Sequence, residues 1–65
     1  MAQNYTVAIA HLADVAAAEE LEGLLHANGI STHRRHNYYG TEYNIYVAPK
    51  DRDQARQIVD TSVSL

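Results

Sequence analysis

Residues 42–48 carry the strongest strand signal in this sequence and constrain what the chain can fold into. Aromatic and β-branched residues, which favour strands, recur at every second position. One face of the segment would carry Tyr43, Ile45 and Val47, and the other Asn44, Tyr46 and Ala48. Pro49 ends the segment, because proline cannot donate to a sheet ladder. We therefore expect residues 42–48 to form the central strand of a sheet.

Two further segments are predicted to be strands. In residues 4–10 the larger side chains alternate with smaller ones, Tyr5, Val7 and Ile9 against Thr6, Ala8 and Ala10. Residues 30–36 are extended in character but polar, which is typical of an edge strand, where charge discourages pairing with another chain. The turn residues at 37–41 join this segment to the central strand as a hairpin.

Two helices are predicted between and after the strands. The first begins at Asp14, whose carboxylate can cap free amide groups, and ends at Asn28-Gly29. Its apolar stripe, at steps of three and four, is Val15, Ala18, Leu21 and Leu25. The second helix covers about residues 52–61, after a capping-box pattern formed by Asp51 and Gln54. Its apolar stripe is Ala55, Ile58 and Val59.

The order β-α-β-β-α predicts an α+β fold in a single domain, residues 1–65. Because crossover connections are right-handed, the first and second strands should be parallel, with the third between them. The expected fold is a ferredoxin-like half sheet with strand order 1-3-2, both helices on one face and no fourth strand. Residues 61–65 alternate polar and apolar, and either a frayed helix end or a short strand fits them.

Small size points to self-association. The chain has 65 residues, no cysteine and only fifteen isoleucine, leucine, valine and methionine residues. A chain of this length buries only about 60% of its unfolded surface, and here no disulfide can compensate. We predict a homo-oligomer, formed through the free edge of the first strand or the apolar face left by the missing fourth. The expected contact residues are Tyr5, Val7, Ile9, Val63 and Leu65.

Charge is distributed unevenly along the chain. The net charge is −3, yet the acidic first half contains no lysine or arginine, whereas residues 33–39 interleave cations with aromatics. The candidate binding residues there are His33, Arg34, Arg35, His36, Tyr38 and Tyr39. Tyrosine is enriched at protein interfaces, so this hairpin favours a protein partner. The alternative is a small binder of nucleic acid or of an anionic metabolite, although the low net charge opposes general nucleic-acid binding.

No reaction is indicated by the remaining motifs. Cysteine is absent, no serine lies in a nucleophile elbow and the glycines are isolated, so we expect neither an enzyme nor a cofactor. His33 and His36 are three apart in a strand and would point to opposite faces, so no metal site is expected. Without an apolar run long enough to span a membrane or a signal-peptide plan, we expect a cytoplasmic protein without membrane contact.

One resemblance covers roughly residues 5–60. The spacing of Tyr5-Thr6-Val7-Ala8, Asp14, Ala18-Glu19, Leu24-Leu25, Gly29-Ile30, Val47-Ala48-Pro49, Ala55-Arg56 and Ile58 resembles a short bacterial family of prokaryotic signal-transducing domains of unknown function. The resemblance implies a βαββα domain distantly similar to the nitrogen-regulatory trimeric signal proteins. It carries over no catalytic or ligand residue. The leading functional hypothesis, which rests on the hairpin and the free sheet edge, is a non-enzymatic interaction or regulatory module that binds a protein, including itself.

Overall fold

A computed structural model describes residues 4–37 and 42–63 of the chain. The elements follow in the order β1 (Val7–Leu12), α1 (Val15–Ala27), β2 (His33–His36), β3 (Tyr43–Val47), a 3-10 turn η1 (Pro49–Asp51) and α2 (Arg52–Val63). No helix in the described part of the chain is long and apolar enough to cross a membrane.

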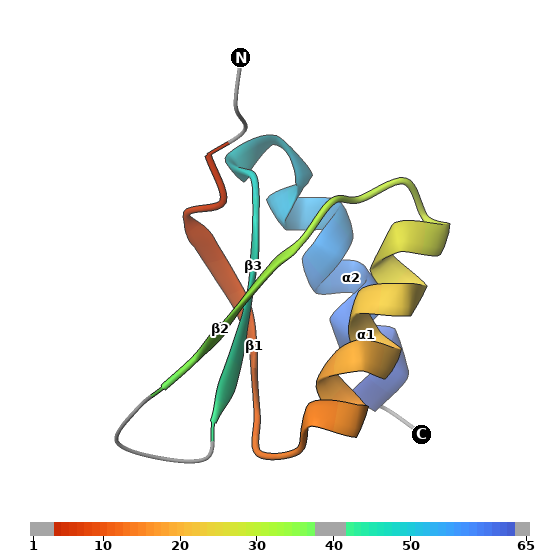
Figure 1. Cartoon of the computed structure of the whole chain (residues 1–65). Coiled ribbons are helices and arrows are strands. Elements are labelled where there is room, and N and C mark those ends of the chain that lie inside the picture. Colours follow the sequence, from red (N-terminus) through yellow and green to blue (C-terminus); the bar gives the residue numbers. More distant parts are fainter. Residues whose placement is uncertain (1–3, 38–41, 64–65) are drawn as a thin grey trace.

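The three strands form one sheet in the order β1-β3-β2. The central strand β3 pairs antiparallel with both neighbours, so β1 and β2 run parallel to each other. Both helices lie against the same face of this sheet (Figure 1), and among the described residues no helix lies on the other face. The predicted α+β arrangement with strand order 1-3-2 is therefore confirmed.

A bulge in β1 changes which of its residues face the helices. Val7 pairs with Val47 and Ala8 with Tyr46, but the next pair joins Ala10 to Ile45, so that Ile9 is the extra residue. A bulge of this kind reverses the alternation that follows it. The prediction that Ala10 shares a face with Ala8 is wrong, because Ala10 packs against the core beneath the helices.

The ends of α1 confirm the signals in the sequence. Asp14 precedes the helix, and its carboxylate accepts a hydrogen bond from the amide of Ala16 at 3.1 Å. Gly29 has the left-handed φ of +79° expected just after a helix. The amide of Ile30 then donates to the carbonyl of Leu25 at 3.0 Å, and Ile30 is buried. Ile30 therefore closes α1, and β2 begins three residues later than predicted.

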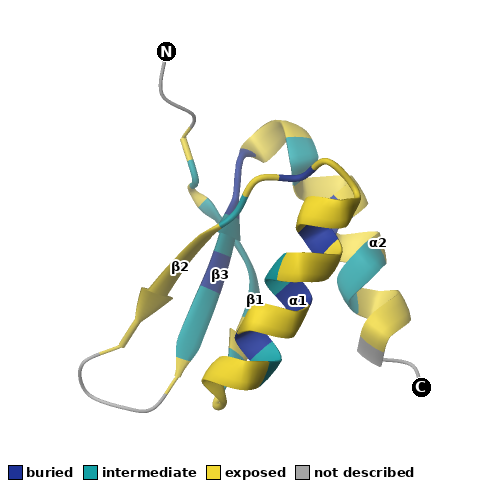
Figure 2. Cartoon of the chain, turned by 45° about the vertical axis from the view of Figure 1, so that its right-hand side comes forward, coloured by how far each residue is buried: buried dark blue, intermediate teal, exposed yellow. Residues whose placement is uncertain are grey.

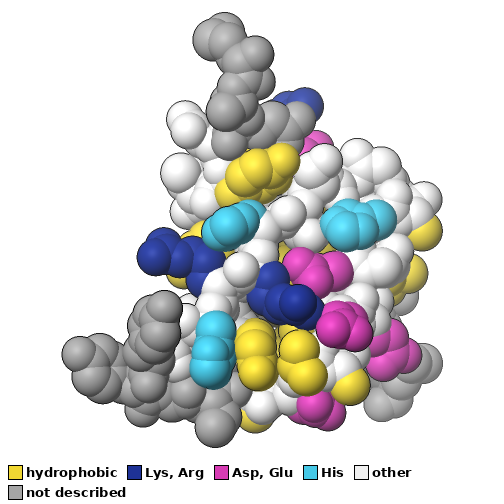
Figure 3. Space-filling model, viewed as in Figure 1, with side chains coloured by type: hydrophobic (Ala, Val, Ile, Leu, Met, Phe, Trp, Pro, Cys, Tyr) yellow, Lys and Arg dark blue, Asp and Glu magenta, His cyan; other side chains and the backbone are white. Residues whose placement is uncertain are grey.

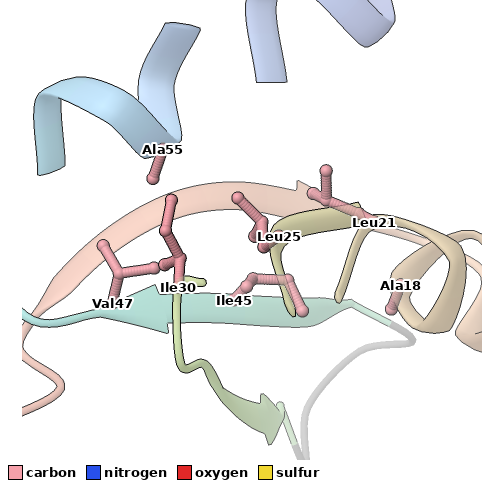
Figure 4. Close-up of a cluster of buried hydrophobic side chains, with 7 residues drawn as sticks. All are labelled: Ala18, Leu21, Leu25, Ile30, Ile45, Val47 and Ala55. Atoms are coloured by element: carbon pink, nitrogen blue, oxygen red, sulfur yellow. The ribbon is translucent and has the colours of Figure 1, made fainter. Parts of the chain in front are cut away.

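The core lies between the sheet and the helices (Figure 2). Seven buried side chains form it, as Figure 4 shows: Ala18, Leu21, Leu25, Ile30, Ile45, Val47 and Ala55. Ile58 and Val59 of α2 pack against this cluster and are half-buried. Val15, expected in the buried stripe of α1, is 39% exposed instead. The helical bounds of α2 include residues 61–63, which decides between the two alternatives left open for them, whereas Leu65 lies outside the described residues.

Candidate functional site

The predicted hairpin patch does not form one surface. Successive side chains of a strand point to opposite faces, and the register of β2 with β3 fixes which residues share a face. His33 pairs with Tyr46 and Arg35 with Asn44, on the face without helices. Arg34 pairs with Ile45 and His36 with Tyr43, on the face that carries the helices. Tyr38 and Tyr39 lie outside the described residues.

We call the helix-free side of the sheet the open face. Its six strand residues form two rows that run across the sheet, because residues paired across antiparallel strands share a face. The first row consists of His11, Asn44 and Arg35, and the second of Ala8, Tyr46 and His33. Each row thus takes one residue from each of the three strands.

Polar groups occupy the first row. The Nδ1 atom of His11 lies 2.6 Å from the Oδ1 atom of Asn44. An amide oxygen can only accept, so His11 donates through Nδ1. Arg35 flanks Asn44 on the other side and is exposed. The row therefore combines an imidazole, an amide and a guanidinium, which between them can donate and accept hydrogen bonds.

Rings dominate the second row. The guanidinium carbon of Arg35 lies 6.0 Å from the centroid of the Tyr46 ring, at the outer limit of a cation–π contact. Tyr5, which precedes β1, stacks on His33 with the ring centroids 6.1 Å apart. On the opposite side of Tyr46 stands Ala8, whose side chain is a single methyl group. A flat ligand would therefore find ring surface next to hydrogen-bonding groups.

The residues on the helix side make contacts within the protein. The guanidinium of Arg34 lies 3.4 Å from Glu22 and 3.7 Å from Glu19, both on α1. His36 stacks on Tyr43 with the ring centroids 4.7 Å apart. Arg34 and His36 are therefore turned away from the open face, and they belong to the packing of β2 and β3.

Histidines do not converge in the described residues, which contain no group of three or more histidine, aspartate and glutamate side chains that could hold a metal ion. His33 and His36 lie on opposite faces of β2, and His11 lies on β1.

Three of the five residues predicted for self-association have partners within the chain. Val7 and Ile9 pack against the core, and Tyr5 stacks on His33. The outer edge of β1 is one of the two edges of the sheet. Self-association through this edge remains a prediction, as do the contributions of Val63, the last residue of α2, and of Leu65, which lies outside the described residues.

Sequence reasoning did not identify His11 and Asn44 as site residues. They come from segments 33 residues apart, and only the pairing of β1 with β3 brings them together. The period-two pattern of residues 42–48 did place Asn44 and Tyr46 on one face, and that was the available signal. What it could not supply was the register, which decides which residues of β1 and β2 lie beside them.

Comparison with known proteins identifies the family. The chain matches the SPOR domain family over residues 2–61 and belongs to it. SPOR domains are peptidoglycan-binding domains found in cell-division proteins. No curated protein and no solved structure matches the chain.

This membership corrects two interpretations of the sequence. The resemblance to signal-transducing domains was wrong, because the motifs that carried it are helix caps and packing positions that unrelated βαββα domains share. The hypothesis of a regulatory signal-transducing module is overturned with it, and the family gives no support to the nucleic-acid alternative.

Proposed function

We propose that this domain binds peptidoglycan through the open face of its sheet. Membership of the SPOR family supports the ligand class, and the open face supports the location. The observation that carries the location is the pair of cross-strand rows, in which Asn44 of the central strand lies between His11 and Arg35, and Tyr46 lies between Ala8 and His33.

The chemistry of the open face fits an amino-sugar polymer. A sugar ring presents C–H groups on its faces, and these are attracted to the negative face of an aromatic ring such as Tyr46. Hydroxyl and acetamido groups on the sugar edges can exchange hydrogen bonds with the polar row. Peptidoglycan also carries carboxylates, and the planar guanidinium of Arg35 suits them. The two rows therefore supply a partner for each kind of group.

The arrangement supports binding rather than a reaction. Tyr46 and Asn44 lie on the central strand, which is paired along both edges, so their backbone positions are well fixed. An extended polymer can lie across such a surface without entering a pocket. We propose accordingly that the domain is a non-catalytic binding module. Peptidoglycan lies outside the cytoplasmic membrane, so the proposal assigns the domain to that side of the membrane and replaces the predicted cytoplasmic location.

Co-sedimentation with purified peptidoglycan tests this proposal. We expect Tyr46→Ala and Arg35→Gln each to weaken binding about tenfold, because each removes a central contact of the kind that dominates interface energies. The matched control is Arg56→Gln. Arg56 is an exposed residue of α2, so this substitution removes the same charge far from the open face.

Two results would contradict the proposal. In the first, Tyr46→Ala and Arg35→Gln bind as tightly as Arg56→Gln while their circular dichroism spectra match that of the unsubstituted domain. In the second, the domain sediments equally well with chitin, a neutral amino-sugar polymer, which would show that the carboxylates of peptidoglycan are not recognised.

A further inference from the structure

The edge strand β2 has no apolar side chain to hold it. Its sequence is His-Arg-Arg-His, and all four residues are exposed. It contributes nothing to the core cluster, although it carries His33 and Arg35 onto the open face. Backbone hydrogen bonds to β3 hold one side of the strand. What fixes it relative to the helices is a group of polar side chains.

That group joins α1 to both sides of His33. Arg34 Nη1 lies 3.4 Å from Glu22 Oε2 and 3.7 Å from Glu19 Oε1. Thr32 Oγ1 donates to the other oxygen of Glu22, Oε1, at 3.2 Å. His26 Nε2 lies 2.9 Å from the same threonine oxygen. In Figure 3 the basic and acidic side chains are seen side by side between β2 and α1.

Glu22 is the central member of this group. One of its carboxylate oxygens accepts a hydrogen bond from Thr32, and the other forms an ion pair with Arg34. Thr32 and Arg34 are the residues immediately before and after His33. Its side chain is only 17% exposed, compared with 66% for Glu19. With Thr32 and Arg34 both held on the helix side, alternation turns His33 to the open face. Arg35 follows on the same face by the same rule.

We propose that Glu22 and Arg34 are positioning residues for the open face, an inference that rests on the proposed function. They touch no ligand themselves. They hold β2 against α1, and so fix where His33 and Arg35 stand beside Tyr46. Partly exposed ion pairs contribute little to global stability, but an edge strand without apolar anchors can open locally when they are lost. The effect on binding should therefore exceed the effect on stability.

The direction in which one substitution changes peptidoglycan binding distinguishes a positioning role from simple electrostatics. Peptidoglycan carries carboxylates, so removing an acid from the domain should leave binding unchanged or strengthen it if only net charge matters. Removing Glu22 should weaken binding if Glu22 positions β2. Glu20→Ala provides the matched control, because Glu20 is an exposed acid on the same helix and lies outside this group of contacts.

The experiment compares Glu22→Ala, Arg34→Gln and Glu20→Ala by co-sedimentation with peptidoglycan, thermal unfolding and amide hydrogen exchange. We expect Glu22→Ala and Arg34→Gln to weaken binding about three- to tenfold, with faster exchange at the amides of β2 and unchanged exchange in β3. The double variant should bind no more weakly than whichever single variant binds more weakly, because the two substitutions remove the same interaction. Glu20→Ala should bind at least as tightly as the unsubstituted domain.

The proposed positioning role is wrong if Glu22→Ala binds peptidoglycan as Glu20→Ala does and leaves amide hydrogen exchange in β2 unchanged. It is also wrong if the losses of the two single variants add in the double variant, which would mean that Arg34 contacts the ligand directly. If the unsubstituted domain does not bind peptidoglycan, the proposed function fails, whereas the exchange rates of β2 still decide whether Glu22 and Arg34 hold the strand.

Discussion

Arg34 and Arg35 are consecutive in the sequence and serve opposite faces of the sheet. The guanidinium of Arg34 lies 3.4 Å from Glu22 on α1, whereas that of Arg35 lies 6.0 Å from the ring centroid of Tyr46 on the open face. The same residue type therefore has two roles within one four-residue strand. Arg34 forms an ion pair with a helix, and Arg35 lies beside Tyr46 on the opposite face.

Two substitutions at Tyr46 separate the contribution of its ring from that of its hydroxyl group. If sugar faces stack on the ring, Tyr46→Phe should bind peptidoglycan within about threefold of the unsubstituted domain, whereas Tyr46→Ala should lose about tenfold. Isothermal titration with soluble peptidoglycan fragments gives both affinities. Equal losses in the two variants would assign the contact to the hydroxyl group and contradict stacking.

Gly23 and Gly29 should respond in opposite directions to replacement by alanine. Neither position has an atom within 4 Å of an added Cβ, so crowding does not distinguish them. Gly23 is a mid-helix residue, and Gly23→Ala should stabilise the domain by about 0.5–1 kcal/mol. Gly29 has a φ of +79°, and Gly29→Ala should destabilise it by about 1 kcal/mol. Urea unfolding of both variants measures the two changes in the free energy of unfolding. Changes of the same sign in both variants would refute the backbone argument.

The cap at Asp14 should contribute about 1 kcal/mol to the free energy of unfolding. Asp14→Ala removes the acceptor for the Ala16 amide, while Asp14→Asn keeps an oxygen in place. We expect the alanine variant to unfold at a lower urea concentration and the asparagine variant to remain close to the unsubstituted domain. The cap would have no measurable role if the alanine and asparagine variants unfolded at the same urea concentration.

Leu24 and Leu25 are adjacent in α1 and provide a matched test of the core. Leu25 is fully buried, whereas Leu24 is 42% exposed. Leu25→Ala should cost about 3 kcal/mol, and Leu24→Ala less than about 1 kcal/mol. A domain of 65 residues has a total stability of only about 3–10 kcal/mol, so the first change should leave much of the protein unfolded at 37 °C. Circular dichroism measured during heating compares the two, and similar midpoints would contradict the burial assigned to Leu25.

Local signals in the sequence were sufficient for most of the fold. The period-two pattern of residues 42–48, the cap at Asp14 and the glycine at position 29 each act within a few residues, and each appears in the structure as predicted. The strand order followed from connection rules that hold for any right-handed βα unit. The boundary of β2 was placed too early because Ile30 looked like a strand residue, although its amide and side chain complete the end of α1.

The sequence by itself determined the order of the elements, most of the apolar stripes of the helices and the alternation of β2 and β3, because these depend on side-chain periodicity and local hydrogen bonding. Only the tertiary structure decided the open face. The bulge at Ile9 reversed the alternation of β1, and the pairing of β1 and β2 with β3 brought His11, Asn44 and Arg35 into one row. Register depends on contacts between segments distant in the sequence. No local pattern specifies which residues will face each other across a sheet.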